Sequence, residues 1–188
     1  GIAGHAVELS EGAIIENCVN SATITSGQNR AEGTGGIIGK DFSSGSVSLE
    51  IKDCLNEGVV TATKNVGGIV GCTKAIISGC VNNGSVCGST NVGGIAGLLI
   101  DGRISKSVNY GGLTVSAKGL GGIAGTAVGV IETSANKGII NENTKGTGGI
   151  VGYANYFVRT AAIVNYQSVK STGTSIGVGG LFGYIKDT

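Results

Sequence analysis

The chain of 188 residues contains no proline, no methionine, no tryptophan and a single histidine, His5. The absence of proline excludes a collagen-like triple helix, although glycine occurs 37 times. Charge is also scarce, because only 13% of the residues are charged and the net charge is +1. Nucleic acid is therefore not an expected partner, since phosphate binding requires clustered lysine and arginine.

Long apolar runs are missing as well. No apolar run exceeds five residues, whereas a membrane-spanning helix needs about 20, so we expect no membrane span. The sequence shows no secretory signal peptide and no initiator methionine, and it opens within a repeat. We expect residues 1–188 to form a single repeat domain and to be a fragment of a longer protein.

Hydrophobic residues, in contrast, make up 40% of the chain, so it can bury enough apolar surface to fold. The glycines are concentrated in a five-residue phrase, Gly-Gly-Ile-x-Gly or a close variant. Copies occur at residues 35–39, 67–71, 93–97, 121–125, 148–152 and 179–183, with a truncated copy at residues 1–4. Self-similarity of this kind indicates a repeat architecture.

A second phrase, of the form Ile-x-x-Cys/Ser-x-Asn, lies between the glycine phrases. Its asparagines are Asn20, Asn56, Asn82, Asn109, Asn136 and Asn165, the last in a degraded copy. The apolar pieces of each unit are five or six residues long, rich in Ile and Val, and bounded by Gly, Asn and Ser. This pattern is typical of strands, and no window has the sustained 3.6-residue apolar period of a helix.

The spacing of the glycine phrases predicts the fold. Their starts are separated by 32, 26, 28, 27 and 31 residues. A period of this size, built from strands and turns, is typical of a solenoid whose units must stack because none can cover its own apolar face. We predict an all-β protein, a single right-handed parallel β-helix of about six coils.

Stacking also suggests what the two phrases do. Equivalent residues lie about 4.8 Å apart in successive coils, so a corner that needs a positive φ angle or a bare backbone needs it in every coil, and glycine meets this need at the lowest cost. The asparagine is expected to tolerate a left-handed corner and to bond its own copies in a ladder. Two alternatives stay open for adjacent apolar residues such as Ile69 and Val70: the chain bends at the glycines, or the strand is buried on both faces.

The variation in length between units is confined to one kind of connection. They are longest between a glycine phrase and the next Ile, at residues 5–14 and 40–50. We therefore expect the long loops to lie on one side of the solenoid, which in repeat proteins is often the binding side.

With both phrases, the chain resembles the GLUG-motif repeat family, which is named for a Gly-Leu-hydrophobic-Gly core. The core reads Gly-Ile-Val-Gly at residues 68–71 and, closest to the family wording, Gly-Leu-Phe-Gly at residues 180–183. The resemblance covers essentially the whole chain, with isoleucine in place of leucine in most copies. It implies a secreted or surface-attached bacterial protein, as in the non-catalytic regions of IgA-specific metallopeptidases and in adhesin-like proteins, and it carries over no catalytic residue.

Three of the five cysteines, Cys18, Cys54 and Cys80, occupy one repeat position, which Ser107 and Ser134 take in later coils. A position that accepts Cys or Ser favours a small side chain, so we predict a stacked row of buried thiols. Stacked neighbours are close enough to bond, but the serines show that no disulfide is required. The odd total excludes a complete disulfide framework, and the Cys-x-x-Cys spacing of metal sites is absent.

Candidate catalytic groups are sparse. His5 lies at the N-terminal edge, so a Ser-His-Asp or Cys-His site is not expected. The twelve Asp and Glu residues do not recur at one repeat position, and the calcium-binding Gly-Gly-x-Gly-x-Asp nonapeptide is missing. A pair of carboxylates about 5 to 10 Å apart, as in glycoside hydrolases, is neither shown nor excluded. We predict a non-enzymatic protein without metal or cofactor.

Aromatic residues cluster towards the C-terminal end, where six of the eight lie at or beyond Tyr153. The candidate binding residues are Tyr153, Tyr156 and Phe157 together with Arg159, because aromatic faces beside a charged donor suit a sugar or peptide ligand. The alternative is that these rings close the end of the stack, where a terminal repeat is expected to be atypical.

The sequence therefore predicts a non-enzymatic repeat segment of a secreted or cell-surface bacterial protein, located outside the cell. It would act in adhesion or as a structural spacer, with a host glycan or an extracellular protein as its partner. The alternative is an accessory region of a secreted IgA-type metallopeptidase that helps to hold the substrate.

Overall fold

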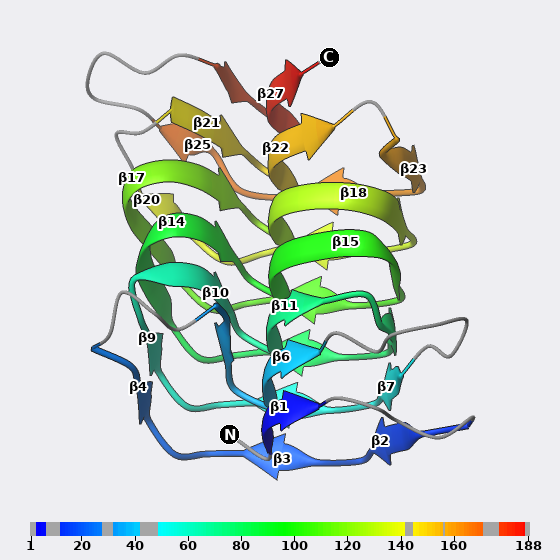
Figure 1. Cartoon of the computed structure of the whole chain (residues 1–188). Coiled ribbons are helices and arrows are strands. Elements are labelled where there is room, and N and C mark those ends of the chain that lie inside the picture. Colours follow the sequence, from blue (N-terminus) through cyan, green and yellow to red (C-terminus); the bar gives the residue numbers. More distant parts are fainter. Residues whose placement is uncertain are drawn as a thin grey trace.

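The computed structural model describes residues 3–6, 12–27, 32–41, 49–141, 145–155, 157–170 and 177–186. Across these residues the chain forms 27 strands and no helix. The strands belong to three sheets of 11, 10 and six members, and neighbouring strands run parallel. Figure 1 shows the coils stacked from the N-terminus at the bottom to the C-terminus at the top.

A central coil illustrates the path of the chain. It runs along β10 (Lys64–Gly67), reverses into β11 (Val70–Thr73), continues through β12 (Ile76–Ser78) and β13 (Val81–Asn82), and enters β14 (Val86–Gly93). The second half of β14 is the counterpart of β10 in the next coil, because the two pair in register. Strands equivalent to β10 are called inward strands, and strands equivalent to β11 are called outward strands.

The remaining strands repeat this path. The other members of the 11-stranded sheet are β1 (Ala3–Ala6), β2 (Ile14–Glu16), β6 (Ile38–Asp41), β7 (Glu50–Lys52), β15 (Ala96–Ser105), β18 (Ala124–Glu132), β22 (Val151–Asn155), β23 (Arg159–Ala161) and β27 (Phe182–Lys186). Those of the six-stranded sheet are β3 (Val19–Asn20), β8 (Leu55–Asn56), β16 (Val108–Asn109), β19 (Ala135–Asn136) and β24 (Val164–Asn165). Those of the ten-stranded sheet are β4 (Ile24–Thr25), β5 (Thr34–Gly35), β9 (Val60–Thr61), β17 (Leu113–Gly121), β20 (Ile140–Asn141), β21 (Lys145–Gly148), β25 (Val169–Lys170) and β26 (Val178–Gly179).

Residues at one repeat position stack directly on one another. Val81 pairs with Leu55 in the preceding coil and with Val108 in the following coil. The predicted all-β solenoid is confirmed, and the stack makes about 5 turns where the sequence predicted about six coils. The two longest predicted loops connect β1 to β2 and β6 to β7, at the same corner of the coil, although most of their residues lie outside the described part of the chain.

The glycine phrase is the point where the chain reverses from an inward to an outward strand. Gly68 and Ile69 form a bend between β10 and β11, and both Ile69 and Val70 are fully buried, so the chain bends at the glycines. No described glycine of these phrases has a positive φ angle. A Cβ on Gly68 would instead collide with the side chain of Asn82 and the backbone oxygen of Gly94. The phrase therefore supplies bare backbone for a close approach.

Left-handed backbone occurs at other places in the coil, one of them directly before the Cys/Ser position. Six residues there have φ angles between 47° and 65°: Asn17, Asp53, Gly79, Lys106, Thr133 and Ala162. Only one of these six residues is glycine, so a positive φ angle at this corner does not select glycine in every coil. Hydrogen bonds between coils help to hold the conformation, as the Asp53 amide shows by donating to the Ser78 oxygen at 3.0 Å. The ladder asparagines are not left-handed.

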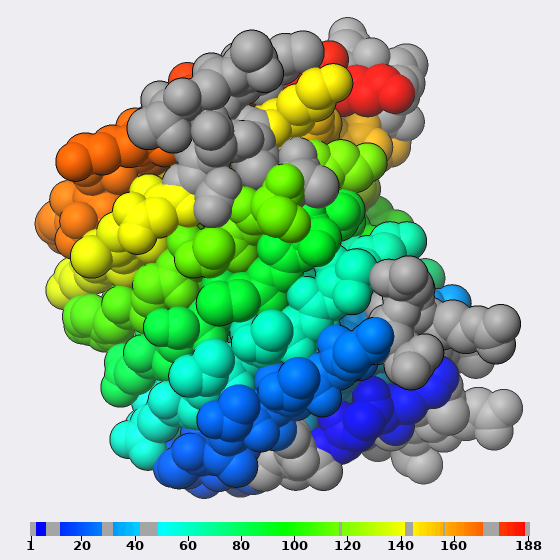
Figure 2. Space-filling view, turned by 90° about the vertical axis from the view of Figure 1, so that its left-hand side faces the viewer, coloured from blue at the N-terminus to red at the C-terminus, as the bar shows by residue number. Residues whose placement is uncertain are grey.

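The reversal at the glycines divides the interior into two cores, which are visible as two lobes in Figure 1. The main core contains fully buried columns such as Ile51, Ile77 and Ile104. The second core lies inside the curved ten-stranded sheet and includes Val60 and Val86. Figure 2 views the molecule from the side of this sheet and shows the coils as successive bands.

Candidate functional site

The buried asparagines form a continuous ladder along the six-stranded sheet. From Asn20 to Asn165, each side-chain Nδ2 donates to the Oδ1 of the asparagine in the next coil, at 2.8 to 3.0 Å. The same nitrogen donates to a backbone oxygen two residues later, as in Asn82 to Gly84 at 2.8 Å. The predicted ladder is therefore confirmed.

The two repeated phrases meet inside the molecule. In the five glycine phrases between residues 35 and 152, the second glycine lies against the side chain of a ladder asparagine. Within the described residues, every buried side-chain nitrogen and oxygen has a hydrogen-bond partner. The same residues contain no group of three or more His, Cys, Asp or Glu side chains that could hold a metal ion. The repeated motifs thus stabilise the stacking of the coils.

The predicted Cys/Ser row is present next to the ladder. Cys54 and Cys80 are at most 1% exposed, Cys18 is half-buried in the first coil, and all three thiols are free. Each thiol donates to the backbone oxygen two residues earlier, at 3.1 to 3.5 Å. Ser107 and Ser134 make the same bond at 2.9 and 2.8 Å. This shared bond explains why cysteine and serine are interchangeable at the position.

Two of the three fully buried thiols, Cys72 and Cys80, are poorly suited to nucleophilic chemistry, whereas a hydrogen bond with Cys80 lowers the pKa of the third, Cys54, to about 7. A hydrogen bond with Cys54, together with burial, raises the pKa of Cys80. Burial also raises the pKa of Cys72, on β11, to about 11. Because the thiolate is the reactive and metal-binding form, Cys72 and Cys80 stay unreactive at neutral pH.

The binding residues predicted near the C-terminal end have different surroundings. Tyr153 on β22 packs on Tyr184 of β27, with ring centroids 5.0 Å apart and planes inclined by 41°, and it covers the backbone of Gly146. Burial accordingly raises the pKa of Tyr153. Phe157 is 60% exposed and Arg159 is exposed. Tyr156 lies outside the described residues, and the predicted binding role of this segment stays a prediction.

A second aromatic group, which sequence reasoning missed, lies on the outer surface beside the ladder. Tyr110 and Tyr166 are 50% and 64% exposed. The Lys137 ammonium, from the coil between them, lies 5.2 Å from the Tyr110 ring centroid and 5.4 Å from that of Tyr166. We call these three residues the tyrosine–lysine row.

The register of the ladder brings the tyrosine–lysine row together. Each of its residues directly follows a ladder asparagine, and those asparagines pair in successive coils. The Lys137 Nζ lies 3.5 Å from the Tyr110 hydroxyl, and the Gln167 side chain donates to the Lys137 oxygen at 3.0 Å. The row holds a cation between two exposed rings. Comparing the residues after each ladder asparagine would have found it from the sequence.

Other charged groups form ion pairs on the surface. Lys40 pairs with Glu32, Lys52 pairs with Glu50, and Arg103 pairs with Glu132 at 2.6 Å. Exposed pairs of this kind contribute about 0 to 1 kcal/mol to stability. His5 is exposed on β1, at the N-terminal end of the stack.

Within the described ranges, the chain offers no helix with the length and hydropathy needed to cross a bilayer. The chain matches no family model, no curated protein and no solved structure. Its function is therefore inferred from the geometry of its surface.

Proposed function

We propose that the chain is a non-enzymatic repeat segment of a secreted or cell-surface bacterial protein of the GLUG-motif type, in which a stiff spacer carries an adhesive face. The tyrosine–lysine row is the observation that supports this proposal most. The rings of Tyr110 and Tyr166 are at least 50% exposed on the outer surface, whereas the buried polar side-chain atoms of the described residues are hydrogen-bonded inside the stack.

The spacer part of the proposal is supported by the way the coils are joined. Three sheets of parallel strands tie each coil to the next, and the ladder adds an amide–amide hydrogen bond at every step. Hydrogen bonds arranged in a chain polarise one another, which strengthens them. At about 4.8 Å per coil, about five turns extend roughly 24 Å. The stack therefore sets a fixed distance between its two ends.

The adhesive part is supported by the chemistry of the tyrosine–lysine row. The rings of Tyr110 and Tyr166 offer apolar faces with polar tips, which suit contact with a sugar ring or with apolar protein side chains. The ammonium of Lys137 offers a positive charge between them. A host glycan or an extracellular protein that carries a carboxylate fits this combination.

The test is a binding screen of residues 1–188 against arrayed host glycans and extracellular-matrix proteins. We expect the wild-type chain to bind a carboxylate-bearing ligand and the Tyr110→Ala/Tyr166→Ala variant to bind it about tenfold more weakly. The matched control is Ile139→Ala, which removes a 56% exposed apolar side chain outside the row and should leave binding unchanged.

The same screen separates the two predicted binding surfaces. Phe157→Ala truncates an exposed ring of the C-terminal aromatic segment without touching the row. Loss of binding in this variant alone would place the ligand on the C-terminal segment and contradict the assignment to the row. Silence of the wild-type chain across the whole panel would remove the adhesive part of the proposal.

A further inference from the structure

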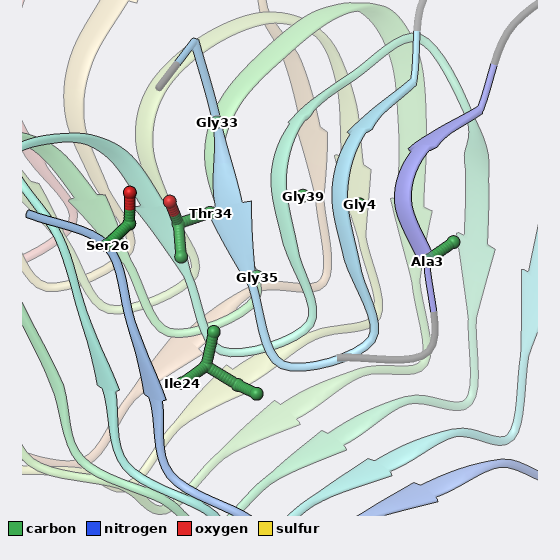
Figure 3. A pocket seen from close by; sticks show the side chains of 8 residues that line it. All are labelled: Ala3, Gly4, Ile24, Ser26, Gly33, Thr34, Gly35 and Gly39. Carbon is green, nitrogen blue, oxygen red and sulfur yellow. The ribbon is translucent and has the colours of Figure 1, made fainter. Parts of the chain in front are cut away.

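The outer face of the six-stranded sheet and of the turn that follows it presents three columns of side chains. They are the residues directly before, directly after and three positions after each ladder asparagine, and we call their surface the ladder face. At the second ladder position they are Leu55, Glu57 and Val59, which alternate with buried residues. In the first coil Thr23 is exposed in the same way, whereas the next residue, Ile24, packs against the second core and lines the cavity of about 340 Å³ shown in Figure 3.

Apolar side chains gather on the ladder face. Val59 is 39% exposed and Ile139 is 56% exposed, in the column three positions after the asparagines. Tyr110 and Tyr166 are 50% and 64% exposed in the column beside it, and Val81 is half-buried in the third column. Exposed apolar side chains that share one face mark an interaction surface, in contrast to those scattered singly.

The ladder face carries one acidic and one basic residue, Glu57 and Lys137, and both are exposed. Glu57 accepts a hydrogen bond from the Ser21 hydroxyl of the preceding coil at 2.7 Å, and Lys137 lies between the two rings of the tyrosine–lysine row. The two charges are three coils apart, a separation of about 14 Å, which is too far for an ion pair within one chain. A partner with the opposite order of charges could pair with both at once.

A second copy of the chain has this opposite order when it is turned around. Two copies that face each other across a twofold axis parallel to the strands run antiparallel along the stack, and each column then lies opposite itself. If the axis passes between the ladder positions of Asn82 and Asn109, the second position faces the fifth. Each Glu57 then lies opposite the Lys137 of the other copy.

The same axis also matches the apolar side chains. Val59 and Ile139 belong to the second and fifth ladder positions, so they face each other in the column three positions after the asparagines. Val81 and Val108 belong to the third and fourth positions and face each other next to the axis. A twofold axis along the stack would instead place Glu57 opposite Glu57, and this repulsion disfavours the parallel orientation.

We propose that the ladder face binds a second copy of this chain in the antiparallel orientation, with two Glu57–Lys137 ion pairs around an apolar centre. The inference rests on the proposed function, because the second copy covers the tyrosine–lysine row as an extracellular protein that carries a carboxylate. Chains attached by the same end to one surface run parallel, whereas chains on two facing surfaces run antiparallel. The contact therefore joins two surfaces that both display the chain.

The size of the ladder face limits the strength of one contact. Its columns extend about 13 Å along the strands and roughly 24 Å along the stack, so each copy buries on the order of 400 Å². A standard interface buries about 800 Å² on each partner, so we expect weak, reversible association with a dissociation constant of about 10 to 100 μM. Many such contacts between two facing surfaces act together and give strong adhesion.

The test is sedimentation equilibrium of residues 1–188, from about tenfold below to about tenfold above the expected dissociation constant. We expect the wild type to show a monomer–dimer equilibrium without higher oligomers, because a twofold contact is closed. Glu57→Lys and Lys137→Glu should each weaken the dimer at least about tenfold, because like charges then face each other twice. Lys64→Glu, a matched reversal at an exposed lysine outside the ladder face, should dimerise like the wild type.

An equimolar mixture of the two reversed variants identifies the orientation. In a mixed pair, the two lysines of Glu57→Lys face the two glutamates of Lys137→Glu, so mixing should restore association to within about threefold of the wild type. The double variant Glu57→Lys/Lys137→Glu should dimerise similarly, because both pairs are restored with exchanged signs. Circular dichroism checks that each variant keeps the wild-type β spectrum.

Two results would overturn the inference. One is a wild-type chain that stays monomeric over the whole range, and binding of a host ligand in the screen would then leave the proposed function standing. The other is a dimer that neither charge reversal weakens, or that the mixture does not restore although both variants are folded. A dimer with the expected charge dependence in a chain that binds nothing on the panel would support the inference and remove the host ligand alone.

Discussion

The central coils and the first coil carry similar residues at the same repeat positions but bury them to different extents. Ile51 and Ile77 are 0% exposed, whereas Ile15, their counterpart in the first coil, is half-buried. On the six-stranded sheet Leu55 is half-buried, whereas its counterpart Val19 is 56% exposed. Burial in this fold is therefore a property of the neighbouring coils more than of the coil itself.

This difference is what a quasi-one-dimensional repeat protein should show. Its stability is approximately a sum of terms for each coil and for each interface between neighbours, so an inner coil has two interfaces and an end coil has one. A substitution at one repeat position should therefore cost more in the centre than at an end.

The largest difference is expected at the second glycine of the phrase. Gly94→Ala places a Cβ against the side chain of Asn109 and the oxygen of Gly122, so we expect a loss of about 4 kcal/mol or more in the free energy of unfolding. Gly180→Ala makes the same change where nothing lies within 4 Å and should cost less than about 0.5 kcal/mol. Urea denaturation measures both. Equal losses would mean that the close approach inferred for the central phrase does not limit stability.

Substitutions in the asparagine ladder should also cost more unfolding free energy in the centre than at the end, but the difference should be smaller. Asn82→Ala removes two donated bonds and the bond accepted from Asn56, inside a fully buried row, and should cost about 3 kcal/mol. Asn20→Ala removes two donated bonds at the less buried end and should cost about 1 to 2 kcal/mol. Thermal and urea unfolding of the two variants check the order. A larger loss for Asn20→Ala would contradict the dependence on neighbours.

The smallest difference concerns pH. Because burial raises the pKa of Cys72 from 9.0 to about 11, its thiol stays protonated in the folded state after the unfolded chain has ionised. The stabilising effect is complete below about pH 9 and is lost as the pH rises to about 11, by about 2.7 kcal/mol at most. Unfolding free energies measured between these pH values should fall less steeply in Cys72→Ala than in the wild type.

A matched thiol at the end of the stack sharpens that prediction. Burial also raises the pKa of Cys18, but this side chain is only half-buried in the first coil. Cys18→Ala should therefore change the alkaline slope less than Cys72→Ala does. A larger change for Cys18→Ala would show that the alkaline loss of stability does not come from the central thiol.

The sequence predicted those features that recur in every coil. Where stacking requires a certain residue, the same or an equivalent residue recurs at that position in every coil. Asn82 could therefore be assigned to a ladder, and Cys80 to a row of small buried side chains. The strands, the all-β solenoid and the interior use of both phrases followed from the same regularity. The number of turns was close, at about 5 against about six coils.

Other features could not be predicted because they leave no column in the sequence. Adjacent apolar residues such as Ile69 and Val70 are compatible with a bend and with a doubly buried strand, and the bend at Gly68 and Ile69 decides between them. The tyrosine–lysine row contains two residue types and is therefore no column of equivalent residues, and it becomes visible in the sequence only when the residues after each ladder asparagine are compared.

The asparagine ladder gives the molecule a chemical direction. Each inner amide, from Asn56 to Asn136, accepts from the coil towards the N-terminus and donates to the coil towards the C-terminus, so an aspartate, which accepts but cannot donate, would interrupt the ladder. Deleting or duplicating one whole coil leaves each remaining ladder asparagine next to another asparagine to which it can hydrogen-bond. Deleting part of a coil moves the asparagines out of register and breaks these bonds. Recombination between repeats can therefore change the length of the protein only in steps of one coil, about 4.8 Å each, and always preserves its polarity.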